Sequence, residues 1–148
     1  MLALAFHVGS DRFALGCAEV IEVVPRVELR SIPHAPEIVP GLFTYRGAIV
    51  PVVDLCQLVR RVPCPERLSS RIIVVRPKGF GERLLGLLAE RVVETIELDE
   101  KTVIRGGIEL REVPYLGEVF IDRGITTQYL RIDGLIAPPR GPLHGMFG

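Results

Sequence analysis

Short runs of β-branched residues, each ended by glycine, proline or a charged turn, constrain this chain more than any other feature. Val and Ile together number 31 among the 148 residues, whereas alanine, the best helix former, occurs 8 times. Val and Ile favour strands, and the 15 glycines and 12 prolines supply tight turns between them. The pattern predicts a mainly all-β fold and excludes a helical bundle. The length fits one domain that can bury its own core.

Leu2, Leu4, Phe6 and Val8 alternate with Ala3, Ala5 and His7, which predicts the first strand over residues 2–8, and a polar turn follows it. Further strands are predicted over 12–16, 20–24, 42–45, 48–53, 72–75, 84–89, 92–98, 115–121 and 125–132. Pro51 inside one of these runs favours an edge or bulge position for that strand. Asp54 is placed to cap one helical turn over 55–59. About ten short strands at such spacings are typical of barrels or sandwiches.

The side chains that carry chemistry are scattered along the sequence. Cys17 and Cys56 lie in apolar stretches and are predicted core residues, whereas Cys64, between two prolines, is predicted to be an exposed loop thiol. An odd number of cysteines without a CxxC pair argues against a disulfide framework or a zinc knuckle. No catalytic or phosphate-binding motif is present. We therefore expect no enzymatic activity, no cofactor and no metal site.

The charge balance limits the classes of partner. The 18 basic and 18 acidic residues cancel, so no general attraction to nucleic acid or anionic lipid is expected. No apolar run reaches the roughly 18 residues that a membrane span needs, and residues 1–8 lack the basic start of a signal peptide. These features predict a cytoplasmic protein without direct membrane insertion. The Pro/Gly-rich tail, residues 138–148, is predicted to be disordered or loosely docked, and deleting 139–148 is expected to be harmless unless the tail docks.

Two charged residues in the first half stand in apolar surroundings. Glu22 interrupts an apolar strand, and Arg46 lies at a Gly-flanked turn between two apolar strands. One interpretation is structural, in which the two charges pair with each other or cap a turn. The other is functional, in which they rim an apolar groove that binds a partner. The residues alone do not separate these interpretations.

The segment 35–55 carries a specific motif. It contains Pro40-Gly41, then Arg46-Gly47 after four residues, Pro51 after three more, and Asp54-Leu55 after a further two. This pattern resembles the signature of the CheW-like family, the coupling proteins of bacterial chemosensory arrays. The flanking strands agree with the family over roughly residues 2–136. The resemblance implies two intertwined five-stranded SH3-like or OB-like barrels with a few short helices, forming one CheW-like domain over residues 1–137.

The resemblance also implies a role and a site. Members of the family act as non-catalytic adaptors that couple the cytoplasmic tip of a methyl-accepting chemotaxis receptor to the regulatory domain of a CheA-type histidine kinase, in arrays at the inner membrane. The family's receptor-contacting acidic position falls on Glu22, and its turn arginine falls on Arg46. The expected partner-binding residues are Val20, Glu22, Val39, Leu42, Tyr45, Arg46 and Gly47.

Two further interpretations concern the pathway. The run from Leu42 to Gly47, with its tyrosine before Arg-Gly, and the later Pro114-Tyr115-Leu116-Gly117 resemble the coupling proteins of Wsp-type surface-sensing systems, which control cyclic-di-GMP. The alternative role on the same fold is a free-standing regulator that competes for kinase or receptor without building an array. Neither a small β-barrel enzyme nor an OB-type nucleic-acid binder finds support, because the acidic and thiol groups have no partner and the nine aromatic residues are scattered.

Overall fold

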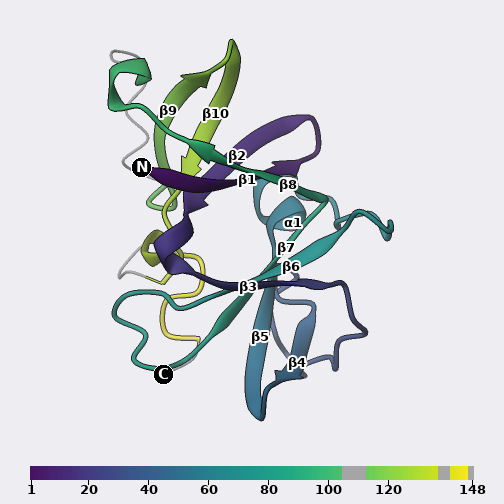
Figure 1. The fold of residues 1–148 in the computed structure, drawn as a ribbon. Helices are drawn as coiled ribbons and strands as arrows, with labels where there is room; N and C mark the ends of the chain where they lie inside the picture. Colours follow the sequence, from purple (N-terminus) through teal and green to yellow (C-terminus); the bar gives the residue numbers. More distant parts are fainter. Residues whose placement is uncertain (105–112, 137–140, 147–148) are drawn as a thin grey trace.

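The computed structural model describes residues 1–104, 113–136 and 141–146. Ten strands within these residues form two five-stranded sheets (Figure 1), which confirms the all-β prediction. Sheet A contains β1 (Leu2–Val8), β2 (Asp11–Gly16), β8 (Arg91–Glu97), β9 (Leu116–Asp122) and β10 (Ile125–Leu130). Sheet B contains β3 (Val20–Pro25), β4 (Gly41–Tyr45), β5 (Ala48–Asp54), β6 (Arg71–Val75) and β7 (Leu85–Ala89). The helical elements are α1 (Leu55–Arg60), η1 (Cys17–Glu19), η2 (Glu100–Thr102) and η3 (Asp133–Leu135).

The chain starts in sheet A, builds all of sheet B with β3–β7 and then returns to sheet A, so that sheet A contains both ends of the sequence and sheet B its middle. Sheet A has the order β8-β1-β2-β10-β9, and sheet B has the order β3-β6-β7-β5-β4. Most neighbours are antiparallel, but β10 pairs with β2 and β5 pairs with β7 in parallel. Each parallel pair joins strands that are distant in sequence, and this pairing makes the two halves interdependent.

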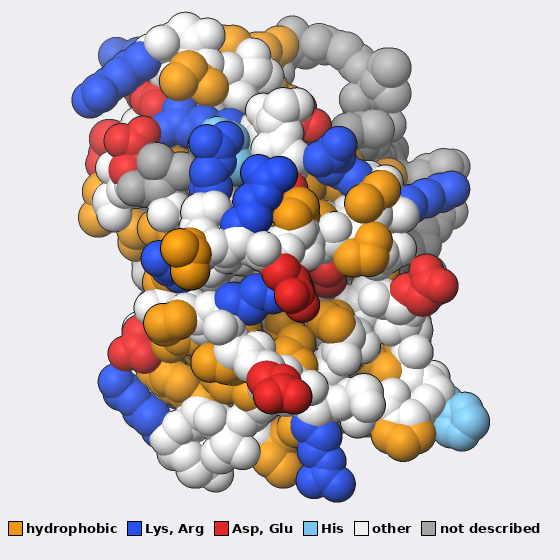
Figure 2. All heavy atoms as spheres, turned by 90° about the vertical axis from the view of Figure 1, so that its right-hand side faces the viewer, with side chains coloured by type: hydrophobic (Ala, Val, Ile, Leu, Met, Phe, Trp, Pro, Cys, Tyr) orange, Lys and Arg blue, Asp and Glu red, His pale blue; other side chains and the backbone are white. Residues whose placement is uncertain are grey.

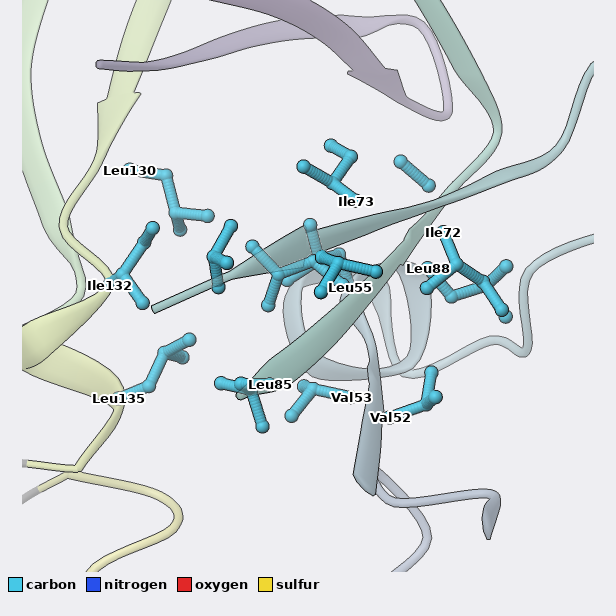
Figure 3. Close-up of a cluster of buried hydrophobic side chains, with 14 of the residues drawn as sticks. Val52, Val53, Leu55, Ile72, Ile73, Leu85, Leu88, Leu130, Ile132 and Leu135 are labelled. Carbon is cyan, nitrogen blue, oxygen red and sulfur yellow. The ribbon is translucent and has the colours of Figure 1, made fainter. Parts of the chain in front are cut away.

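The largest apolar cluster joins the two sheets. Figure 3 shows Leu130, Ile132 and Leu135, from the segment that leaves sheet A, facing the buried side chains of sheet B. All four residues from Ile72 to Val75 are completely buried, as their unbroken apolar run predicts. A smaller cluster lies within sheet A and contains Ala3, Ala5, Ala14, Ile96, Leu98 and Phe120. The shared core means that neither sheet is covered without the other.

Arg12 connects the two edge strands of sheet A. Its side chain on β2 is only 5% exposed, and it bonds at 3.0 Å to Glu94 on β8 and at 3.0 Å to Asp122 on β9. Because β8 and β9 are opposite edges of the sheet, one buried guanidinium holds both edges. Five N–H donors in a planar fork suit arginine to this double contact.

His7 lies on β1 directly across from Arg12 and Arg91 on the neighbouring strands. Burial, and then the positive charges of Arg91 and Arg12, lower the pKa of His7, and Glu90 opposes them. In the unfolded chain His7 takes up a proton near pH 6.5, whereas in the folded chain it takes up that proton only at a lower pH. The contribution of His7 to stability is present above about pH 6.5 and is lost as the pH falls towards the lowered pKa.

Replacing His7 by glutamine is therefore expected to reduce the loss of unfolding free energy between about pH 7.5 and about pH 5.5. The measurement is urea unfolding at both pH values for wild type and variant. His144→Gln controls for the removal of a histidine elsewhere in the chain. An unchanged pH dependence in His7→Gln would show that other groups carry it.

Where the structure describes the tail, it is docked on the main core, which decides between the two alternatives. Leu143 is 1% exposed and belongs to the main core, and its N–H donates to the Leu135 carbonyl at 2.7 Å. Met146 also packs against this core. Leu143 and Gly145 line one pocket together with Phe80 from the loop between β6 and β7. Residues 138–140, 147 and 148 lie outside the described residues, but 141–146 are docked, and deletion of 139–148 is not expected to be harmless.

Candidate partner-binding site

The β4–β5 hairpin explains why the predicted motif has its spacing. Arg46 and Gly47 form its two-residue turn with φ values of 47° and 79°. Two positive φ angles define a turn whose twist matches that of the strands, and glycine adopts such an angle without steric cost. The turn directs the Arg46 side chain outward from the tip, where it is 73% exposed.

The remaining motif positions have structural causes as well. A Cβ at Gly41 would lie 2.5 Å from the Arg30 carbonyl oxygen, because Arg30 forms a β-bridge to Leu42. Pro51 was expected at an edge or bulge, yet β5 is an inner strand, which corrects that prediction. Its pairing with β7 begins only at Val52, and Pro51 faces Leu42 at a position of the β4–β5 ladder that needs no proline N–H.

Asp54 ends the motif as a buried helix cap. It is 4% exposed, and one carboxylate oxygen, Oδ1, accepts the backbone N–H groups of Cys56 at 2.9 Å and Gln57 at 3.1 Å. The other oxygen, Oδ2, accepts the N–H of Cys64 at 2.9 Å. This confirms the predicted cap of α1 and adds a contact to the loop that follows the helix.

Cys64 is buried, which contradicts its prediction as an exposed loop thiol. Its side chain is 3% exposed. Besides the bond from its N–H to Asp54, its carbonyl accepts the Arg26 guanidinium at 3.1 Å. These two anchors hold the segment between Pro63 and Pro65 against the core. Neither anchor is adjacent in sequence, so the flanking prolines alone suggested an exposed loop.

Glu22 and Arg46 form an ion pair that connects the two edge strands of sheet B. Arg46 Nη2 lies 3.0 Å from Glu22 Oε1, and the Glu22 side chain is 39% exposed. Glu22 is on β3 and Arg46 follows β4, and these strands are the two edges of the sheet. The interpretation that the two charges pair is therefore realised. An exposed pair of this kind contributes about 0–1 kcal/mol to stability, so its position does not require a structural role.

The Tyr45 ring lies against the Arg46 guanidinium. The Arg46 guanidinium lies 5.2 Å from the centre of the Tyr45 ring, within the range of cation–π attraction. The ring is 8% exposed and contacts Phe43 edge-on. Its buried hydroxyl forms no hydrogen bond within the described parts of the chain. Burial is the main cause that raises the pKa of Tyr45, so the phenol remains neutral near pH 7.

The other predicted residues do not all join this group. Val39 is 3% exposed and belongs to the main core, so its side chain is not available to a partner in this structure. Val20 is half-buried at the start of β3. Leu42 lies at the opposite end of β4 from Tyr45. The structure thus brings Glu22, Tyr45, Arg46 and Gly47 together and places Leu42 on a neighbouring surface.

Leu42 lines an apolar groove of about 580 Å³ on the outer side of the hairpin. Its apolar lining includes Ile32, Leu42, Ile49, Pro51, Leu84 and Met146. Ile49 is 68% exposed, because Val50 and Val52 on the same strand face the core and leave Ile49 and Pro51 outside. The alternation along β5 was predictable from the sequence, whereas the contribution of Leu84 and Met146 to the same groove was not.

A second apolar strip lies along the free edge of sheet B. Ile21, Val23 and Val27 on and after β3 are 40%, 36% and 41% exposed, respectively, and Ile21 and Val23 flank Glu22. Figure 2, which shows the right-hand side of Figure 1, has hydrophobic side chains gathered in its lower half, at the level of sheet B, with acidic and basic side chains around them. Because successive side chains of a strand point to opposite faces, Ile21 and Val23 lie on the face of β3 opposite to Glu22 and its ion pair.

Three side chains that could offer metal ligands lie close together among the described residues. Asp54, Cys56 and Cys64 place one carboxylate oxygen and two sulfurs within 4.8 Å of one another, although the sequence suggested no such cluster. The carboxylate already accepts three backbone N–H groups. No helix in the described ranges is both long and apolar enough to cross a bilayer.

Comparison with known proteins places the fold. The family model of the CheW-like domain matches residues 2–139. Chemotaxis protein CheW of Rhizobium meliloti (strain 1021) is 28% identical over 100 residues, which cover 68% of this chain and 63% of that protein. Chemotaxis protein CheW of Thermotoga maritima is 26% identical over 97 residues, which cover 66% of this chain and 62% of that protein. The matched part thus spans a little under two thirds of the length of these relatives.

A solved structure gives the same answer for the fold. The scaffolding protein CheW from Thermoanaerobacter tengcongensis superposes with a TM-score of 0.80 at 24% identity, over 92% of this chain and 87% of that one. The two interdependent sheets and the match over residues 2–139 agree with the resemblance that the motif first indicated. The chain belongs to the CheW-like domain family.

Proposed function

We propose that this chain is a non-catalytic chemosensory adaptor that couples the tips of methyl-accepting receptors to a CheA-type histidine kinase in arrays at the inner membrane. Membership of the CheW-like family supports this role. The observation that carries the proposal is that sheet B presents two candidate contact surfaces, the exposed Glu22–Arg46 pair and the Leu42–Ile49 groove. A bridging protein needs two surfaces that can be occupied at the same time.

The first surface suits a helical receptor tip. A helix binds through an apolar stripe, and a few charges fix its register. Ile21 and Val23 supply exposed apolar area on the same edge strand, on the face opposite to Glu22. Arg46 adds a guanidinium that can exchange its bond to Glu22 for one to an acidic group on the receptor, because the pair is exposed. We assign Glu22, Tyr45, Arg46 and Gly47 to this contact.

The second surface suits the kinase. The groove is largely apolar, with Glu82 and Arg83 in its lining, so it fits a partner that contributes an apolar hairpin or loop rather than a charged helix. The regulatory domain of the kinase, which the family resemblance gives the same barrel fold, has elements of this kind. We assign Leu42 and Ile49 to the kinase contact.

Replacing Arg46 by alanine is expected to weaken receptor binding about tenfold and to leave kinase binding unchanged, because a partner-facing arginine is lost while the core is untouched. The measurement is calorimetric titration against a soluble receptor tip and, separately, the kinase regulatory domain. Arg123→Ala is a matched control, since Arg123 and Gly124 form the same kind of turn between β9 and β10, with φ values of 51° and 79°.

Two more variants complete the experiment. Glu22→Lys places a like charge beside Arg46 and should also weaken receptor binding. Ile49→Glu places a charge in the apolar groove and should weaken kinase binding alone. A fall of several degrees in the melting temperature of Arg46→Ala, with unchanged affinity, would return the ion pair to a structural role. Wild type that binds neither partner while folded would overturn the adaptor function, and binding to one alone would favour the free-standing regulator.

The output pathway rests on the resemblance alone. The Tyr45-Arg46-Gly47 turn and the Pro114–Gly117 segment resemble Wsp-type coupling proteins, and we infer from this resemblance a diguanylate cyclase response regulator downstream. Reconstitution of the adaptor with its kinase and a candidate response regulator, read as cyclic-di-GMP synthesis, tests this branch.

A further inference from the structure

Cys56 and Cys64 lie against each other in the core, although the sequence separates them by a helix and a loop. Their sulfurs are within 4.8 Å of each other, and their exposed fractions are 2% and 3%. Both backbone N–H groups donate at 2.9 Å to the Asp54 carboxylate, one to each oxygen. We propose that Cys56 and Cys64 form a reversible intramolecular disulfide that joins α1 to the loop after it. The proposal is independent of the proposed function.

The shared anchor on Asp54 favours this bond. A disulfide forms readily only where the backbone already holds two cysteines close together and oriented towards each other. Here one carboxylate fixes the start of α1 and the loop simultaneously, and Arg26 holds the Cys64 and Pro65 carbonyls at 3.1 and 2.9 Å. The thiols are therefore arranged before oxidation, and closing the bond orders little additional chain.

The contact between the two thiols makes one of them the better nucleophile. It is the first cause that lowers the pKa of Cys56, and the same contact is the first cause that raises the pKa of Cys64. Burial and the negative charges of Asp54 and Glu90 oppose that lowering of the Cys56 pKa, and the backbone of Gly9 adds to it. A thiolate attacks disulfides far faster than a thiol does, so Cys56 is expected to react first.

The oxidant in this scheme is a small-molecule disulfide such as oxidised glutathione. The Cys56 thiolate attacks one of its sulfurs, breaks the S–S bond and releases one glutathione thiolate, which takes up a proton. Cys64 loses its proton and attacks the Cys56 sulfur of the mixed disulfide. The second glutathione thiolate leaves with that proton. Two cysteine thiols are oxidised to one disulfide, and oxidised glutathione is reduced to two molecules of glutathione.

Access for the oxidant comes through the loop rather than through the core. Residues 61–63 and 66–69 around Cys64 are exposed, and Leu68 is 97% exposed. Local opening of this loop uncovers the pair without unfolding of either sheet. Because α1 packs against β1, β5 and β7, the closed bond adds a covalent link where the two sheets meet.

The test uses the full chain, first reduced and then equilibrated in native buffer with mixtures of reduced and oxidised glutathione. After quenching and denaturation, a maleimide–polyethylene glycol reagent counts the remaining thiols on a gel. We expect wild type to lose two of its three cysteine thiols without carrying a bound glutathione at the end of the reaction. Peptide mapping should show a Cys56–Cys64 link. Dithiothreitol should restore all of them, and the oxidised form should melt roughly 5 °C higher.

Matched variants separate this result from general oxidation. Cys17→Ser should still form the link, because Cys17 is not part of the pair, whereas Cys56→Ser and Cys64→Ser should form none. Stable glutathione adducts on wild type, links that involve Cys17, or oxidation only in denaturant would each overturn the proposal. So would retention of bound zinc by the reduced protein that blocks oxidation, since the cluster would then be a metal site.

Discussion

Asp54→Ala is expected to lower the free energy of unfolding by about 3 kcal/mol. Loss of a helix cap costs about 1 kcal/mol, and the buried N–H of Cys64 adds about 1–3 kcal/mol when it is left without a partner. Asp54 is 4% exposed and accepts three backbone N–H groups, so water cannot readily replace it. Chemical denaturation monitored by circular dichroism measures the change, and Cys64 should become more reactive to a maleimide in the native state.

Two variants define the origin of that loss. Asp54→Asn keeps one acceptor oxygen of similar shape and should retain part of the stability. Asp99→Ala removes an exposed cap that accepts a single backbone bond from Lys101 at 2.9 Å, and it should cost less than about 1 kcal/mol. An effect of Asp54→Ala as small as that of Asp99→Ala would mean that Asp54 does not hold the loop.

Leu143→Ala is expected to lower the free energy of unfolding by about 3 kcal/mol, the usual cost of truncating a leucine in a well-packed core. The side chain is 1% exposed and belongs to the core that joins the two sheets. A chain that ends at residue 140 should be destabilised at least as much, because it also loses Met146 and the bond to the Leu135 carbonyl. Thermal and urea unfolding measure both variants.

His144→Ala is the control within the same tail. His144 is exposed, so its replacement should change stability by no more than about 0.5 kcal/mol. If Leu143→Ala and the truncated chain both unfold like wild type, the tail is not part of the core in solution. A loss confined to Leu143→Ala and the truncation establishes that the last residues complete the fold.

The local elements and much of the site were predictable because short-range chemistry specifies them. Alternation of large apolar residues predicted β1, and the unbroken apolar run over residues 72–75 predicted the buried part of β6. The Arg46-Gly47 turn and the Asp54 cap each depend on neighbours within a few residues. The motif also indicated the family, and the match over residues 2–139 confirms it.

The errors concern contacts between residues that are distant in sequence. Cys64 is buried because Asp54 and Arg26 bind its backbone, and Leu143 is buried because the core between the sheets extends to it. Val39 is apolar, as a groove residue would be, but the packing of the segment before β4 places its side chain in the core. None of these positions carries a local signal that separates a buried apolar residue from an exposed one.

The period of the side chains and the chemistry of the turns decide where strands, hairpins and the helix cap occur, since each depends on a few adjacent residues. Only the folded chain decides that β2 pairs with β10 and β5 with β7, and hence that both ends of the sequence share one sheet. The same holds for the Glu22–Arg46 pair, the Leu42–Ile49 groove and the Cys56–Cys64 contact. The physical reason is that burial and pairing depend on the whole core, in which many weak contacts act together across long stretches of chain.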